Sequence, residues 1–134
     1  MGSQQLLMIV IGVVIVGIMI AVGLFMFRDQ AAATSRDSIS NDLVSLATSA
    51  QKYHRRPTTF GGGGNSFTGL TIGKLTTKSS NENGDYVLTP DPVPAGQVSI
   101  TITGIGMELG LNGATPVMLT MTVMADSILL VTNN

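Results

Sequence analysis

Two different hydrophobic patterns follow one another in the first 56 residues of the chain. Residues 6–27 form an unbroken run of 22 apolar or small residues, LLMIVIGVVIVGIMIAVGLFMF. As a helix rising about 1.5 Å per residue, this run measures roughly 33 Å, which is enough to cross a bilayer. In residues 29–56 the apolar positions instead recur at steps of three and four, as in an amphipathic helix. This apolar stripe consists of Ile39, Leu43, Leu46, Ala50 and Tyr53.

The two patterns belong to one helix. No proline or glycine interrupts residues 24–56, and Pro57 disfavours a helical conformation at Arg56. We therefore predict one helix from about Ser3 to Arg55, apolar all round in its front half and apolar on one face in its rear half. The basic residues of its last turn are interpreted as charges that complement the helix C-terminus rather than as a ligand site. They are Lys52, His54, Arg55 and Arg56.

Beyond Pro57 the pattern becomes strand-like. The four glycines of residues 61–64 predict a loop. Apolar residues alternating largely with Ser or Thr predict strands near 86–89, 98–103, 117–123 and 127–132. The Asn83-Gly84 pair predicts a hairpin turn joining residues 71–78, or their neighbours, to the strand at Tyr86. A calcium loop is a weaker interpretation of residues 81–85, because Ser79 and Pro90 occupy the places of its acidic ligands.

The predicted fold class is α+β, with a long N-terminal helix packed on a small antiparallel sheet of about four strands. Such a sheet has one apolar face to cover, and the helix stripe is the apolar helical surface available for it. We expect three segments: 1–28 as the transmembrane half of the helix, 29–56 as the amphipathic half, and 57–134 as the Gly-rich loop and sheet domain.

Composition narrows the functional classes. With a net charge of −1 and 11% charged residues, the chain lacks the excess of Lys and Arg that neutralises phosphates in nucleic-acid binding. The absence of cysteine excludes disulfides, thiolate metal sites and cysteine nucleophiles. His54 is the sole histidine, so no second imidazole can complete a zinc site. We predict a protein that is not an enzyme and has no catalytic, cofactor-binding or metal-binding residues.

The apolar run is predicted to be a retained helix rather than a cleaved signal peptide. The hydrophobic part of a signal peptide is about 7–15 residues long and follows basic residues, whereas MGSQQ contains none. The orientation stays open. All seven Lys and Arg residues follow the run, which favours an outward amino end, but a basic leader removed earlier would have held that end in the cytoplasm.

The first 55 residues resemble the type IV pilin family. The resemblance rests on the polar start MGSQQ, the apolar helix LLMIVIGVVIVGIMIAVG, the amphipathic continuation to Arg55 and the junction AQKYHRRPTTFGGGGNSFTG. It implies a pilin-like fold and a structural subunit cut by a prepilin peptidase, commonly with a methylated N-terminus. The subunit waits in the inner membrane, and the pilus assembly machinery adds it to a helical homo-oligomeric filament. Such a filament lies on the cell surface, with adhesion and motility as the associated roles.

The resemblance also implies which residues meet at subunit contacts. Gln5 stands where the family usually has glutamate, so it can hydrogen-bond to a neighbouring amino terminus but cannot form a charge pair with it. Cleavage after Gly2, which leaves Ser3 first, is an alternative registration. The chain also lacks the family's frequent mid-helix proline, having Val22 there, and its C-terminal disulfide. The expected assembly residues are Met1, Gln5, Leu6, Gly12, Gly17 and Gly23.

Two other functions fit the same sequence. The first is a pseudopilin of a type II-like secretion system, which forms a short periplasmic filament that drives export. The second is an uncleaved, signal-anchored periplasmic domain that binds a partner and never polymerises.

Overall fold

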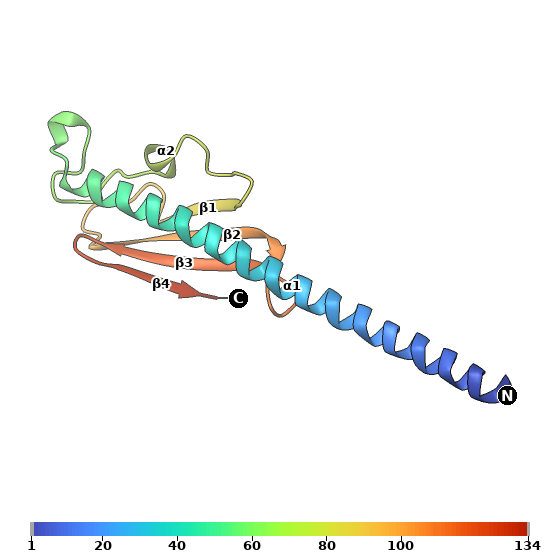
Figure 1. The fold of residues 1–134 in the computed structure, drawn as a ribbon. Helices are drawn as coiled ribbons and strands as arrows, with labels where there is room; N and C mark the ends of the chain where they lie inside the picture. Colours follow the sequence, from blue (N-terminus) through green and yellow to red (C-terminus); the bar gives the residue numbers. More distant parts are fainter. Residues whose placement is uncertain (1, 134) are drawn as a thin grey trace.

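The computed structural model describes residues 2–133, which form one long helix followed by a four-stranded sheet (Figure 1). The helices are α1 (Gly2–Arg55), the short 3-10 helix η1 (Thr58–Phe60) and the one-turn helix α2 (Ile72–Leu75). The strands are β1 (Gly84–Thr89), β2 (Ser99–Leu109), β3 (Pro116–Met124) and β4 (Ile128–Thr132). They pair antiparallel in the order β1-β2-β3-β4. The predicted α+β fold class is confirmed.

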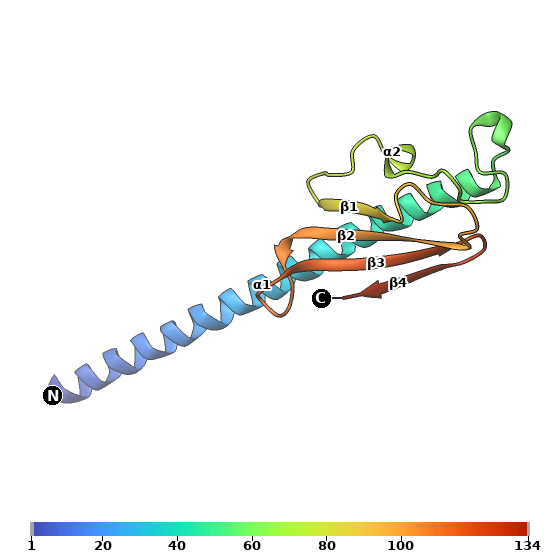
Figure 2. The ribbon, with the colours of Figure 1, turned by 180° about the vertical axis from the view of Figure 1, so that it is seen from behind.

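The helix α1 is continuous over 54 residues, which agrees with the predicted bounds to within one residue at its described amino end. Its rear half lies across one face of the sheet, and its front half projects from the head as a rod (Figures 1 and 2). We use "head" for the rear half of α1, from residue 29, together with all that follows it. The two halves share one backbone but have different surroundings.

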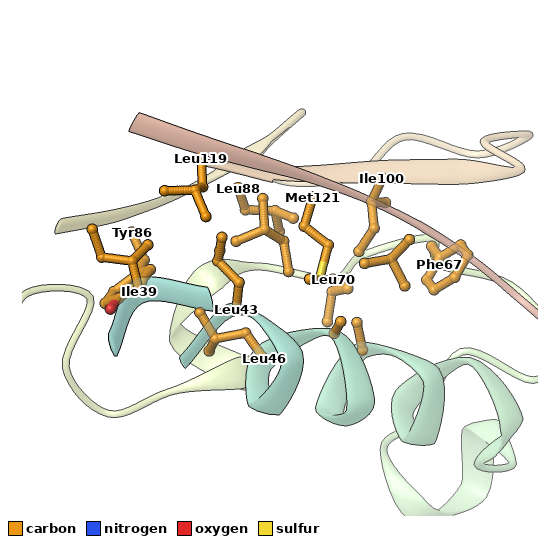
Figure 3. Close-up of a cluster of buried hydrophobic side chains, with 14 of the residues drawn as sticks. Ile39, Leu43, Leu46, Phe67, Leu70, Tyr86, Leu88, Ile100, Leu119 and Met121 are labelled. Carbon is orange, nitrogen blue, oxygen red and sulfur yellow. The ribbon is translucent and has the colours of Figure 1, made fainter. Parts of the chain in front are cut away.

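The core lies between the rear half of α1 and the sheet (Figure 3). Alternate residues of β2 and β3 point inward and are buried, as the period of two along a strand requires. Ile39, Leu43, Leu46 and Ala50 are buried in this core, and Tyr53 is partly buried against it. Ala32 and Ala47, which lie outside the predicted stripe, are buried as well. The core is completed by Phe67, Leu70, Tyr86, Leu88, Val93, Ile100, Ile102, Val117, Leu119, Met121 and Val123.

Two glycines of β2 let the helix approach the sheet closely. A Cβ atom added to Gly104 would lie 2.5 Å from Ile39 Cγ2. One added to Gly106 would lie 2.8 Å from both Ile39 Cδ1 and Ser35 Oγ. Any side chain at these positions would therefore press against α1 where it crosses β2.

The predicted glycine loop is present, and it caps the C-terminus of α1. The backbone N–H of Gly63 donates to the Tyr53 carbonyl at 2.8 Å, and that of Asn65 donates to the His54 carbonyl at 2.7 Å. Gly63 cannot carry a side chain, because a Cβ there would lie 1.7 Å from the Ser66 carbonyl oxygen. The helix-end carbonyls predicted to meet basic side chains are thus bonded by loop amides. Arg55 instead donates to the Ala125 carbonyl at 3.5 Å.

The predicted hairpin arm at residues 71–78 is wrong. Residues 72–75 form α2, because Ile72 and Leu75 are three apart and one helical turn places both against the core. The turn at residues 81–84 does form, since the Asn81 Oδ1 atom accepts hydrogen bonds from the Asn83 and Gly84 amides at 2.8 and 3.1 Å. The neighbouring residues Ser79 and Ser80 do pair across this turn, as the prediction allowed. An antiparallel bridge joins Ser80 to Asp85, and the Tyr86 amide donates to the Ser79 carbonyl at 2.7 Å.

Candidate membrane anchor and assembly surface

The front half of α1 is exposed on every side. Every large apolar residue from Leu6 to Phe27 is exposed, from 46% at Ile15 to 76% at Met8. By length and composition, α1 is the one helix among the described residues that could cross a membrane. Burying a single Val, Leu, Ile or Phe side chain contributes about 1.5–3 kcal/mol, so covering the whole run is worth roughly tens of kcal/mol. The head buries none of these side chains, and α1 is therefore a candidate membrane anchor.

The three glycines of the front half lie in open surroundings. A Cβ atom added to Gly12, Gly17 or Gly23 would meet no atom within 4 Å. At about 100° per residue, Gly12 and Gly23 lie within roughly 20° of each other around the helix, while Gly17 lies about 140° from Gly12. The glycines therefore mark two faces of the rod where the backbone of another helix can approach closely.

The polar end of α1 lies far from the head. Gln5 and Leu6 are exposed, and Gln5 stands roughly 36 Å along the helix from Asp29 at about 1.5 Å per residue. Among residues 2–133, no residue of the head contacts the amino-terminal end of α1. Met1, the remaining predicted assembly residue, lies outside the described residues.

Tyr53 joins the last turn of α1 to the segment that precedes and includes α2. Its hydroxyl donates a hydrogen bond to the Thr68 carbonyl at 2.8 Å. The Lys74 ammonium lies 5.3 Å from the centre of the Tyr53 ring and donates to the Gly69 carbonyl at 2.9 Å. The last residue of the predicted stripe therefore joins α1 to the loop before α2 as well as to the core.

The sequence pattern did not predict a group of polar side chains that joins α1 to the turn before β1. We call Asp42 with its partners Asn81, Asn83 and Tyr86 the Asp42 clamp. The Asp42 Oδ2 atom accepts hydrogen bonds from Asn83 Nδ2 at 2.8 Å, from Asn81 Nδ2 at 3.0 Å and from the Tyr86 hydroxyl at 2.5 Å. Partial burial acts to raise the pKa of the Asp42 carboxyl, but these donors outweigh it and hold the pKa below its ordinary value. Burial, followed by the Asp42 hydrogen bond and charge, raises the pKa of Tyr86. The clamp fastens the turn at residues 81–84 to the helix.

The sole histidine packs against an aromatic ring. The His54 and Phe67 ring centroids are 4.6 Å apart, and His54 Nδ1 is buried without a hydrogen-bond partner among the described residues. Within residues 2–133, no three His, Cys, Asp or Glu side chains are grouped so that they could hold a metal ion.

The edge strand β4 is a second exposed apolar surface. All five of its residues are exposed, and four of them are large and apolar, from 38% exposure at Ile128 to 58% at Leu129. Its register places Leu129 opposite Thr122 and Leu130 opposite Met121, so apolar side chains leave both faces of the strand. Most proteins protect such an edge with charge, proline or a covering element. The sequence predicted the strand but not its exposure, which depends on its edge position.

Comparison with known proteins identifies no relative, because no family model, curated protein or solved structure matches the chain.

Proposed function

We propose that this chain is the structural subunit of a type IV pilus-like filament, in which its apolar rod lies in the filament core. The single observation that carries the proposal is the continuity of α1. One helix holds a head through its rear half and exposes 22 apolar residues on all sides through its front half. One continuous helix thus joins the head to the rod, and the rod is the longest exposed apolar surface among residues 2–133.

The rod can be covered in two different environments, and this supports a subunit that is first a membrane monomer and later part of a filament. Lipid tails cover a helix that is apolar all round, and so do neighbouring helices of the same kind. We propose that the subunit waits in the inner membrane as a monomer and then exchanges lipid for other copies of the rod. A prepilin peptidase and the assembly machinery would act on it in between.

The head also has properties that suit close packing of many copies. Only 11% of residues are charged, so neighbouring heads repel one another weakly. A helical polymer needs two different contact surfaces on each subunit, because head-to-tail contacts are heterologous. The rod and the β4 edge are two separate exposed apolar surfaces of the chain.

Two measurements on cells that make the full-length protein test this function. We expect negative-stain microscopy of sheared cell-surface material to show filaments, and mass spectrometry of the subunit to show a processed, methylated amino terminus. Protein found only as an unpolymerised inner-membrane monomer, with the assembly machinery intact, would contradict the proposal. Short periplasmic filaments that require a secretion machine would indicate a pseudopilin. An unprocessed terminus without any polymer would indicate an anchored binding domain.

A further inference from the structure

One end of the sheet lies at the level where the apolar run of α1 stops. Arg28 is the first charged residue after the run, and it touches the loop between β2 and β3. A Cβ atom added to Gly113 in this loop would lie 2.5 Å from Arg28 Nη2. Phe27, Arg28 and Ala31 of α1 also share a groove of about 200 Å³ with Glu108 and Leu109 of β2. The end of β2 and its following loop therefore flank the point where the rod leaves the head.

This end of the head carries exposed apolar side chains. Met107 is 61% exposed, Leu109 47% and Leu111 62%. Phe27, which is 72% exposed, lines one groove with Met107 and another with Leu109. We call Met107, Leu109 and Leu111 the loop patch. β2 alternates buried inner with half-buried outer residues as far as Gly106, and its last three residues are all exposed. The patch thus begins where β2 extends past the core.

The loop that carries the patch has a defined conformation. The Asn112 Oδ1 atom accepts hydrogen bonds from the Ala114 and Thr115 amides at 3.0 and 3.1 Å, and the Gly110 amide donates to the Thr115 carbonyl at 2.8 Å. These bonds hold Leu111 at the tip, away from the core. The apolar side chains of the loop patch are therefore exposed to the surroundings of the rod.

We propose that the loop patch inserts into the interface of the bilayer that α1 crosses, so that the unassembled subunit is attached to the membrane at two points. This inference rests on the membrane anchor of the proposed function. A bilayer covering residues 6–27 has its surface near Arg28, a residue type common at that level, and the loop touches Arg28. The patch therefore continues the apolar surface of the rod sideways along the membrane plane. Apolar side chains on a structured element enter this interface readily.

The absence of cysteine makes a direct test possible in the full-length chain. Single cysteines carrying an environment-sensitive fluorophore would be placed at Ala114 in the loop, at Ala21 in the rod and at Val98. Val98 is 82% exposed and directly precedes β2 at the opposite end of the sheet, so it is a matched apolar control. Each labelled protein would be reconstituted in phosphatidylcholine vesicles at high lipid excess, with nitroxide-labelled lipid as the quencher.

We expect the labels at positions 114 and 21 to be quenched by lipid and the label at position 98 to remain unquenched. Adding Leu109→Ser and Leu111→Ser to the protein labelled at position 114 should lower its lipid quenching by about two-fold or more, because the polar replacements favour water. The label at position 21 should be unaffected by these two changes, which shows that the anchor stays inserted.

Three outcomes separate the possible failures. Quenching at position 21 without quenching at position 114 would overturn the two-point attachment and leave the anchor intact. No quenching at position 21 would overturn the membrane anchor itself, and the loop proposal with it. If the label at position 114 changes its emission only as protein density rises, without lipid quenching, the patch binds a second copy of the chain and the membrane proposal is wrong.

Discussion

The two halves of α1 have the same backbone conformation and opposite surroundings. In the front half, apolar residues cover the whole circumference and all of them are exposed. In the rear half, one stripe is apolar. Its first four residues are buried in the core shared with the sheet, and Tyr53 is partly buried against that core. One continuous helix can therefore bury part of its surface in a folded core and leave the rest of its surface exposed. Stability of the head depends on the rear half, while the front half is available for lipid or for other copies.

The largest difference between the two halves of α1 is expected when the same charge is placed in each of them. Leu43→Asp should unfold the head, because burying an unpaired carboxylate costs several kcal/mol, comparable to the whole stability of a small domain. The matched variant Val14→Asp lies in the exposed rod and should leave the thermal unfolding of the head unchanged while it impairs membrane insertion. Circular dichroism melting in detergent measures the first effect. An unchanged melting temperature for Leu43→Asp would refute the packing of the stripe.

Glycine substitutions test the same contrast with a smaller perturbation. Gly104→Ala should destabilise the head by about 1–3 kcal/mol, because its Cβ would lie 2.5 Å from Ile39 Cγ2 and the core would be overpacked. Gly12→Ala in the rod meets no atom within 4 Å and should leave the head's stability unaltered. Urea unfolding of both variants makes the comparison. Equal stability of Gly104→Ala and Gly12→Ala would mean that Ile39 of α1 does not lie close to Gly104 of β2.

Of the two halves of α1, only the rear half should make the stability of the head depend on acidic pH. The pKa of Asp42 is lowered in the folded protein, so its stabilising effect is complete above the unfolded pKa of about 3.9 and is lost as pH falls through the folded value. Asp42→Asn should cost about 1 kcal/mol at pH 7 and remove part of the stability loss below about pH 4. The exposed Asp37→Asn is the control, expected to retain the full acid response. Urea unfolding at both pH values checks this, and an unchanged acid response in Asp42→Asn would contradict the clamp.

The smallest expected effect concerns the polar end of the front half. Gln5→Leu should reduce filament yield several-fold without changing the amount of monomer in the membrane. A net hydrogen bond is worth about 0.5–1.5 kcal/mol, and leucine keeps the helix apolar and inserted. Immunoblots of sheared and membrane fractions would measure both quantities. Wild-type filament yield from the Leu variant would show that Gln5 only marks the membrane interface.

Periodicity in the sequence was enough to predict the helix, its division into two halves and the approximate positions of the four strands, although β2 continues to Leu109, beyond the predicted end at residue 103. These features follow from periodicity, which is local: steps of three and four place residues on one helix face, and steps of two place them on one strand face. Ile39, Leu43, Leu46 and Ala50 could be placed in the core this way. The exposed rod could be anticipated because 22 consecutive apolar residues exceed any face that one small sheet can cover.

Contacts between residues distant in the chain became visible in the folded structure. The Asp42 clamp joins residues about 40 positions apart, and no local pattern marks a partner for a helical carboxylate. Residues 71–78 looked extended, yet burial of Ile72 and Leu75 against an already formed core favoured a helical turn. The same holds for Gly104, whose missing side chain matters only because Ile39 lies above it. Periodicity is a property of neighbouring residues, whereas contact, burial and edge position arise from the packing of the whole chain.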